Sequence, residues 1–309
     1  MPSFGISRES GALKRVLVHH PGRELELANQ DPEEHHFEMP VDVDKFASDH
    51  RELMDALEGA GVEVLNVGTL LADDQRLSEE VLRCPNLVFT RDSSAVTDCG
   101  AILMRMGLLS RRRETPLIEA AHEAIGVPVS LRLAEPETFE GGGFALLEGR
   151  VAVAGLCNRT TQGALDAVRE FLFGEGLVDT FVVLRLAPDD IHIDGDFAEL
   201  PGRTALVHRG ALGHAPAVFH TPSETWEMGF VDWLEEEGWD TLEITDQERN
   251  DAAANFLTVD SDLAIHYTGN PRVMREARER GIDVIQIPGE EMKKGMGGVH
   301  CMTCPILRT

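Results

Sequence analysis

Apolar and polar residues alternate along the chain in a pattern that repeats five times. A typical repeat has two runs with the two-residue period of a strand, one run with helical spacing, and a final apolar run. In the first helical run, Leu53, Met54, Leu57 and Ala60 recur at helical intervals and fall on one face. The pattern therefore predicts five strand–strand–helix–strand units and an α/β fold.

The predicted helices, one for each unit, are Val43–Gly59, Glu114–Ile125, Gln162–Phe173, Glu224–Glu237 and Pro271–Arg280. The predicted strands are Lys14–His20, Val62–Val67, Leu87–Arg91, Ala101–Met106, Val127–Leu133, Gly143–Leu147, Arg150–Ala154, Thr180–Leu186, Ile191–Leu200, Arg203–His208, Thr241–Thr245, Phe256–Val259, Leu263–Tyr267 and Asp283–Ile287. The first unit lacks one strand, and the C-terminal run Val299–Ile306 is expected to supply it by pairing back.

Five such units suggest a closed ring. A single unit cannot bury both faces of its sheet, and radial repetition protects the sheet edges. We therefore expect residues 1–309 to form one domain, a five-bladed α/β propeller with pseudo-fivefold ββαβ repeats around a central channel and helices outside. The least regular stretch, Arg23–Val41, has the length of a lid or binding loop.

The composition is strongly acidic: 54 Asp and Glu against 28 Lys and Arg give a net charge of −26. Such a charge argues against nucleic acid and anionic membranes as partners. An acidic surface is also typical of proteins from a salt-rich cytoplasm, although genome composition explains it equally well. Five cysteines and no apolar run of signal-peptide or membrane-spanning length predict a cytoplasmic protein.

A candidate nucleophile lies near the C-terminus, where Cys301 follows a Gly-Gly pair and a histidine. A thiolate is a strong nucleophile near neutral pH when its pKa is lowered. Cys301 and Cys304 have the spacing of half a zinc site, but the sequence has no second pair of this kind, and a redox pair is expected at a helix start. For the other cysteines we expect a buried structural role; they are Cys84, Cys99, Cys157 and Cys304.

Polar residues recur at the predicted strand ends. Asp92 ends an apolar run, Glu140 precedes three glycines, and His192 and Asp194 alternate at strand period and so face the same side. Taken singly, each has an ordinary alternative: Asp92 as the partner of Arg91, Glu140 as a loop carboxylate, and His192 as a core histidine. As a set with Cys301 they come from different units, and a ring would gather them around its channel.

The C-terminal sequence Gly297-Gly298-Val299-His300-Cys301-Met302-Thr303-Cys304-Pro305-Ile306-Leu307-Arg308 resembles the C-terminal signature of bacterial arginine deiminases. Phe89-Thr90-Arg91-Asp92, Glu140-Gly141-Gly142 and His192-Ile193-Asp194 match the other active-site motifs of that family, in the same order. The resemblance runs from about Gly5 to the C-terminus. It implies a member of the guanidino-group-modifying superfamily, whose fold is the five-bladed α/β propeller.

Carried over residue by residue, the resemblance implies that Cys301 is the nucleophile, His192 the general acid and base, and Glu140 the partner of His192. Asp92 and Asp194 would hold the guanidinium. The substrate carboxylate would bind Arg111 and Arg159, and Phe89 would line the substrate site. The implied reaction is hydrolysis of arginine to citrulline and ammonia through an S-amidino cysteine. It needs no metal and no organic cofactor, and its partner is a small guanidino molecule. A homodimer is possible.

Two departures from the family pattern concern the substrate. Gly143 stands where arginine deiminases usually have an aspartate, and Met296 stands where they have an arginine that helps to bind the carboxylate. The helical insertion of typical arginine deiminases is missing between Leu65 and Asp92. In this compactness the chain is similar to dimethylarginine dimethylaminohydrolases, so an N-methylated arginine or another guanidino compound is an alternative substrate. An amidinotransferase and a non-catalytic arginine-binding protein are further alternatives, which Glu140 and the intact nucleophile argue against.

Overall fold

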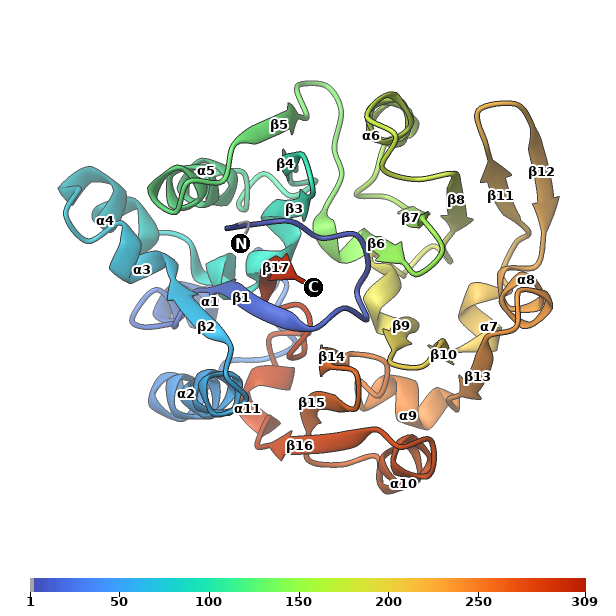
Figure 1. The fold of residues 1–309 in the computed structure, drawn as a ribbon. Coiled ribbons are helices and arrows are strands. Elements are labelled where there is room, and N and C mark those ends of the chain that lie inside the picture. The colour runs from blue at the N-terminus through green and yellow to red at the C-terminus, as the bar shows by residue number, and fades with distance from the viewer. Residues whose placement is uncertain (1–2) are drawn as a thin grey trace.

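The computed structural model describes residues 3–309 as a mixed α/β structure in which small sheets are arranged around a central region (Figure 1). Over these residues the strands form five separate sheets, and the sheets are not joined into one barrel. Helices lie on the outside; they include α2 (Val43–Gly59), α5 (Glu114–Ala124), α6 (Gln162–Gly174), α8 (Phe230–Glu236) and α10 (Pro271–Glu279). Within residues 3–309, every helix is too short or too polar to pass through a lipid bilayer.

Each sheet contains the same three-strand arrangement, with a central strand that pairs antiparallel with one neighbour and parallel with the other. The sheets, with the central strand second, are β17 (Cys304–Arg308), β1 (Leu13–Val18) and β2 (Glu63–Asn66); β3 (Ser94–Thr97), β4 (Gly100–Leu103) and β5 (Val129–Arg132); β6 (Phe144–Leu147), β7 (Val151–Leu156) and β8 (Thr180–Arg185); β9 (Phe197–Leu200), β10 (Thr204–Val207) and β13 (Asp240–Glu243); and β14 (Leu257–Asp260), β15 (Leu263–Tyr267) and β16 (Asp283–Ile287). The predicted return of the C-terminal strand to the first unit is therefore confirmed.

Four of the outer helices, α2, α5, α6 and α10, match the helical runs of the sequence within one residue at each end. The helices are α1 (Leu25–Gln30), α2 (Val43–Gly59), α3 (Val67–Leu70), α4 (Gln75–Val81), α5 (Glu114–Ala124), α6 (Gln162–Gly174), α7 (Arg209–Leu212), α8 (Phe230–Glu236), α9 (Asp246–Asn250), α10 (Pro271–Glu279) and α11 (Glu290–Lys293). Helix α2 buries Leu53, Met54 and Leu57 as predicted, and the Asp42 side chain caps it by accepting a hydrogen bond from the Lys45 amide.

Three predicted strands begin later than expected, because short 3₁₀ helices precede them. The 3₁₀ helices are η1 (Pro85–Val88), η2 (Thr90–Ser93), η3 (Gly141–Gly143) and η4 (Ile193–Gly195). The predicted strand Leu87–Arg91 is thus wrong: Pro85 cannot donate a ladder hydrogen bond, and the Phe89 amide donates to the Asn86 carbonyl instead. Likewise, only the last four residues of the predicted strand Ile191–Leu200 form a strand, and the C-terminal strand starts at Cys304 instead of Val299.

The predicted helix Glu224–Glu237 is half wrong. Its first part forms strand β12 (Thr225–Met228), which pairs with β11 (Ala217–His220), and helix α8 starts only after Gly229. Threonine and tryptophan favour strands, and their alternating exposure fits the edge of a sheet. This hairpin leaves the fourth unit and pairs through β11 with β8, so it widens the third sheet to five strands.

The irregular stretch Arg23–Val41 contains α1 and then a turn-rich segment that lies against the site. The carbonyl of His35 accepts a hydrogen bond from Asn86 Nδ2 at 2.8 Å, and the Glu38 amide donates to the Lys294 carbonyl at 2.8 Å. The carbonyl of Glu34 accepts from Ser110 Oγ at 3.2 Å. The segment therefore bridges three parts of the chain in this structure.

Candidate active site

Cys301 lies in the loop between α11 and β17, and two glycines let this loop come close to its neighbours. A Cβ atom on Gly297 would lie 2.3 Å from Phe89 Cε1, and one on Gly298 would lie 2.2 Å from Asn255 Oδ1. Real Cβ atoms do not approach so closely, so a side chain at either position would displace the loop. The Gly-Gly pair therefore places Cys301 at the base of the site.

The Cys301 thiol is buried and hydrogen-bonded on two sides. Its Sγ donates to Asp194 Oδ2 at 3.0 Å and accepts from Asn255 Nδ2 at 3.0 Å. Burial, together with the charges of Asp194 and Asp92, raises the pKa of Cys301 well above its ordinary value. Without a bound cation the sulfur is therefore a thiol.

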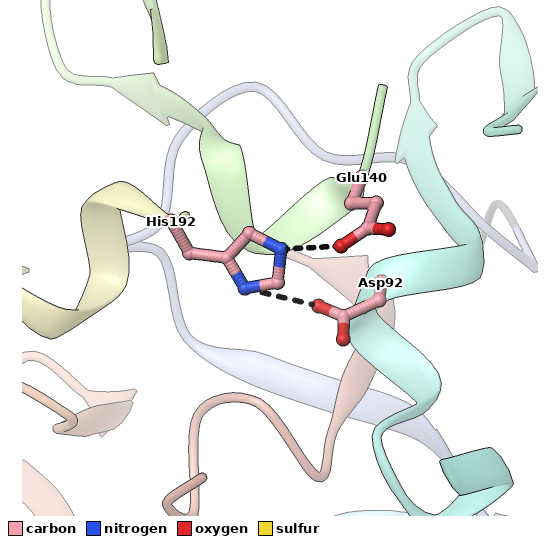
Figure 2. Close-up of side chains that lie close together, drawn as sticks. All are labelled: Asp92, Glu140 and His192. Atoms are coloured by element: carbon pink, nitrogen blue, oxygen red, sulfur yellow. Dashed lines mark hydrogen bonds and ion pairs between the residues drawn. The ribbon is translucent and has the colours of Figure 1, made fainter. Parts of the chain in front are cut away.

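His192 lies between two carboxylates, as Figure 2 shows. Its Nε2 is 2.8 Å from Glu140 Oε2, and its Nδ1 is 3.7 Å from Asp92 Oδ1. Burial lowers the pKa of His192, but the charges of Asp92, Glu140 and Asp194 outweigh it and raise the pKa above its ordinary value. Protonated His192 therefore donates to Glu140 from Nε2, and its Nδ1 faces the site.

Two of the site carboxylates, Glu140 and Asp194, are held as anions by their partners. Burial alone raises the pKa of Glu140, but the hydrogen bond from His192, the charge of Arg111 and the Gly107 amide lower it below its usual value. Burial also raises the pKa of Asp194, but hydrogen bonds from His300 and Cys301 outweigh this effect and lower the pKa below its usual value. These shifts favour a cation-binding site.

Both predicted carboxylate-binding arginines are buried beside these anions. Arg111 Nη1 donates to Asp92 Oδ2 at 2.7 Å, and its Nε and Nη2 bind Glu114. Arg159 Nη1 donates to Glu140 Oε2 at 3.2 Å, whereas its Nη2 is buried without a hydrogen-bond partner among residues 3–309. Burial lowers the pKa of Arg159 to about 10, so it remains a cation at neutral pH.

Two pockets meet at Cys301 and His192. The inner pocket, of about 40 Å³, is lined by His36, Asn86, Phe89, Asp92, Arg111, Arg159, Ile191, His192, Gly295, Met296, Gly297 and Cys301. The outer pocket, of about 440 Å³, is lined on its other side by acidic residues that include Glu38, Asp189 and Asp190, together with Arg249 and Lys293. Asp194 lines the outer pocket. Thus every predicted site residue except Glu140 lines one of the two pockets, and Glu140 lies behind His192.

Over residues 3–309, Asp92, Glu140 and His192 form the group of three whose ligand-type atoms lie close enough to hold a metal ion, within 4.8 Å of one another. Two of these atoms, His192 Nε2 and Glu140 Oε2, already share a hydrogen bond of 2.8 Å. A metal bound there would have to displace that proton. The arrangement therefore suits a histidine held by carboxylates better than a metal centre.

Asn255 is a site residue that the sequence analysis missed. Its Oδ1 accepts from the His300 amide at 2.9 Å, while its Nδ2 donates to Cys301 Sγ and to the Asp194 carbonyl. One side chain thus holds Cys301, its loop and the neighbouring turn. Its position was the available signal: Asn255 stands just before β14, as Asp92, Asp194 and Cys301 stand just before the antiparallel strands of their own sheets.

The chain is similar to known proteins over nearly its whole length. The family model of arginine deiminase matches residues 74–308. The arginine deiminase of Mycobacterium avium (strain 104) is 25% identical over 395 aligned residues, which cover 99% of this chain and 98% of the relative. That of Rhodococcus erythropolis (strain PR4 / NBRC 100887) is 24% identical over 396 residues, which cover 99% and 97%.

Solved structures share the fold. A cysteine-to-serine mutant of dimethylarginine dimethylaminohydrolase from Pseudomonas aeruginosa, in complex with citrulline, has a TM-score of 0.73 and 22% identity over 96% of this chain and 100% of that one. The N-terminal domain of ArgZ, a cyanobacterial arginine dihydrolase bound to substrate, has a TM-score of 0.73 and 19% identity over 95% and 98%. In size, the chain thus matches the dimethylaminohydrolase.

Together, the fold, the buried cysteine and the carboxylate-flanked histidine define a hydrolase that acts on carbon–nitrogen bonds in linear amidines. The family model covers about three quarters of the 309 residues, and the chain belongs to the arginine deiminase family. The alignments with the bacterial arginine deiminases span more positions than this chain has residues, in agreement with the expected missing insertion.

Proposed function

We propose that this chain hydrolyses L-arginine to L-citrulline and ammonia through a covalent S-amidino intermediate on Cys301. The observation that carries the proposal is the lining of the inner pocket. It places Arg111 and Arg159, which suit a carboxylate, in the same pocket as Asp92, His192 and Cys301, which suit a guanidinium. We also interpret residues 1–309 as one catalytic domain and the five sheets as blades of an α/β propeller.

In this mechanism the substrate activates its own nucleophile. A guanidinium bound between Asp92 and Asp194 would offset the negative charges that raise the pKa of Cys301. The thiol proton then passes to solvent, and the thiolate attacks the central guanidinium carbon. His192, protonated and held at Nε2 by Glu140, is oriented to donate a proton from Nδ1 to the leaving nitrogen.

The second half of the reaction reverses the role of His192. When the carbon–nitrogen bond breaks, ammonia leaves and the amidino carbon remains bonded to sulfur. Neutral His192 then takes a proton from a water molecule, and the resulting hydroxide attacks that carbon. The carbon–sulfur bond breaks, the remaining hydroxyl proton restores the Cys301 thiol as the ureido carbonyl forms, and citrulline is released with His192 again protonated.

A substrate panel tests the proposal directly. Purified protein would be incubated with L-arginine, N-methylated arginines, agmatine and guanidino acids without an α-amino group, and ammonia, methylamines and ureido products would be measured. We expect the highest kcat/KM for L-arginine. If L-arginine is inert while another guanidine is turned over, the proposed substrate is wrong and the chemistry is retained.

A second candidate substrate is an N-methylated arginine or a guanidine with a reduced head group. It is favoured by Met296, which is 63% exposed, lines both pockets and carries no charge where the family pattern has an arginine. Arg159→Gln separates substrates with a carboxylate from guanidines with a reduced head group, because it removes the cation whose Nη2 has no partner among residues 3–309. We expect its KM to rise for substrates with a carboxylate and to stay near wild type for agmatine. An N-methylated arginine is identified instead by the methylamine that the substrate panel measures.

A further inference from the structure

His300, the residue before the nucleophile, connects the site to the centre of the molecule. Its Nδ1 lies 2.9 Å from Asp194 Oδ2, and its Nε2 lies 3.8 Å from Glu9 Oε2. The side chain is 12% exposed. The ring thus stands between two carboxylates, one that lines the outer pocket and one that belongs to the N-terminal segment.

Glu9 is held as an anion on the side of His300 that faces away from the substrate. Arg91 Nη1 donates to Glu9 Oε1 at 2.9 Å, and Arg308 Nη2 lies 3.6 Å from Glu9 Oε2. Burial raises the pKa of Glu9, but Arg91, His300 and Arg308 outweigh it and hold the pKa well below the usual range. Glu199 lines the same small cavity as Glu9 and His300, and burial raises its pKa to about 7.

The backbone of His300 is fixed as well. Arg91 Nε donates to the His300 carbonyl at 3.0 Å, and the His300 amide donates to Asn255 Oδ1 at 2.9 Å. The ring therefore meets Asp194 in a geometry that the surrounding chain determines. This is the arrangement expected of a group that orients another group.

Asp194 Oδ2 has two donors, Cys301 Sγ at 3.0 Å and His300 Nδ1 at 2.9 Å. Only the histidine bond remains once the thiol has lost its proton. Among residues 3–309, His300 is therefore the hydrogen-bond donor that stays on this oxygen throughout the reaction, and it acts together with the charge of His192.

We propose that His300 is a positioning residue: supported by Glu9, it holds Asp194 ionised and oriented toward the guanidinium and Cys301. This inference rests on the proposed function, because it assigns to Asp194 a contact with the substrate cation. It predicts opposite effects on the two partners of Asp194. Without the histidine, Asp194 protonates more easily, which weakens its hold on a cation and removes a charge that raises the pKa of Cys301.

Two alkylating reagents separate these effects. Chloroacetamidine is a cation that resembles a guanidinium, and iodoacetamide is neutral; each transfers its carbon to the Cys301 thiolate and releases a halide. In His300→Leu, the rate of alkylation by chloroacetamidine should fall, while the rate with iodoacetamide should stay equal or rise. We expect the ratio of the two rate constants to fall at least tenfold, roughly the effect of one charge-assisted hydrogen bond.

His300→Asn is the matched control, because its amide can donate from a position near that of Nδ1. Its rate ratio should lie within about threefold of wild type. If His300→Leu does not fold, His300→Gln replaces it, since glutamine places its amide nearer the position of Nε2. A general distortion of the loop would slow both reagents together, and that result, or an unchanged ratio in His300→Leu, would overturn the proposal.

Kinetics give a second readout. In His300→Leu, kcat/KM for the best substrate should fall about 10- to 100-fold, and its acid limb should move to higher pH as the pKa of Asp194 rises. In His300→Asn, both kcat/KM and the position of its acid limb should stay close to those of the wild-type protein. The ratio of the two alkylation rate constants can be measured without turnover. A wild-type protein without hydrolase activity would therefore contradict the proposed function, while the alkylation rates would still test the role of His300.

Discussion

At the scale of single residues, Gly142 shows how closely the site is packed. A Cβ atom at this position would lie 2.5 Å from His192 Nδ1 and 2.9 Å from Asp92 Oδ1, between the two groups. The glycine therefore lets the histidine and the carboxylate approach each other to 3.7 Å. Neither side chain gives way easily, because Asp92 is buried and bonded to Arg111, and His192 is bonded to Glu140.

We predict that Gly142→Ala lowers kcat/KM by about 100-fold or more, because displaced catalytic groups lose that much from small misplacements. Gly195→Ala is the control, since Gly195 lines the outer pocket and a Cβ atom there meets nothing within 4 Å. Steady-state kinetics of both variants check the prediction. Equal losses in the two variants would contradict it.

The pH dependence of the reaction should report His192. The free-enzyme pKa of His192 is raised, so its protonated form persists near neutral pH, and kcat/KM should fall as the pH rises through that raised value. Glu140→Gln removes one anion that raises the pKa, so the alkaline limb of kcat/KM should move to lower pH. A pH–rate profile of both proteins measures this; an alkaline limb that does not move would contradict the assignment of His192 as the acid.

At the scale of elements, the five sheets place one site residue each at the same point. Asp92, Glu140, Asp194, Asn255 and Cys301 lie two to four residues before β3, β6, β9, β14 and β17, the antiparallel strands of their sheets. Figure 1 shows these strands nearest the centre. The repeated pairing scheme thus explains why residues so far apart in sequence meet in one site.

This arrangement also explains what the sequence could predict. Outer helices such as α2 were predicted within a residue or two, because one apolar face of each packs on the core over several turns. The short 3₁₀ helices were missed, because three or four residues carry no periodicity and η2 has the apolar neighbours of a strand. Asn255 was missed because an asparagine after three alanines has no motif of its own; only the superposition of units identifies it.

Helix α5 offers a test of stability. His122, on this helix, is buried, with its Nε2 2.8 Å from Ser94 Oγ, and burial lowers its pKa to about 4. The folded pKa lies below the unfolded value of about 6.5, so the unfolded chain binds the proton first as the pH falls. This group therefore destabilises the fold between about pH 6.5 and pH 4.

From that difference, His122 should contribute a loss of about 2 kcal/mol in the free energy of unfolding between pH 8 and pH 5. Denaturant unfolding at the two pH values measures the total change, to which other groups also contribute. His122→Gln does not titrate and should lose about 2 kcal/mol less than wild type. The same loss in both proteins would show that His122 has no part in the acid sensitivity.

At the scale of the whole molecule, charge is the dominant property. The excess carboxylates behind the net charge of −26 repel one another in the folded state. Salt screens this repulsion, with a screening length of about 10 Å at 0.1 M. Many ion pairs are exposed, such as Arg150 with Asp179, and each contributes little. Repulsion should therefore outweigh attraction in the response to salt.

We predict that Tm rises as KCl increases from low to molar concentration. Thermal unfolding followed by circular dichroism, with activity measured in the same solutions, checks this. Sucrose at matched osmolality controls for solute exclusion from the protein surface. A constant or falling Tm would mean that screening of the ion pairs dominates, and it would exclude adaptation to a salt-rich cytoplasm.

The hydrogen bonds of Cys301 have a consequence for the lifetime of the protein under oxidative stress. Peroxides attack thiolates and not thiols, and the first product, a sulfenic acid, can proceed to irreversible acids. With Asp194 beside it and burial around it, the resting sulfur keeps its proton. Under the proposed mechanism, the thiolate forms when a cation occupies the pocket, and that cation covers the sulfur. The enzyme is therefore least vulnerable to damage when it is idle.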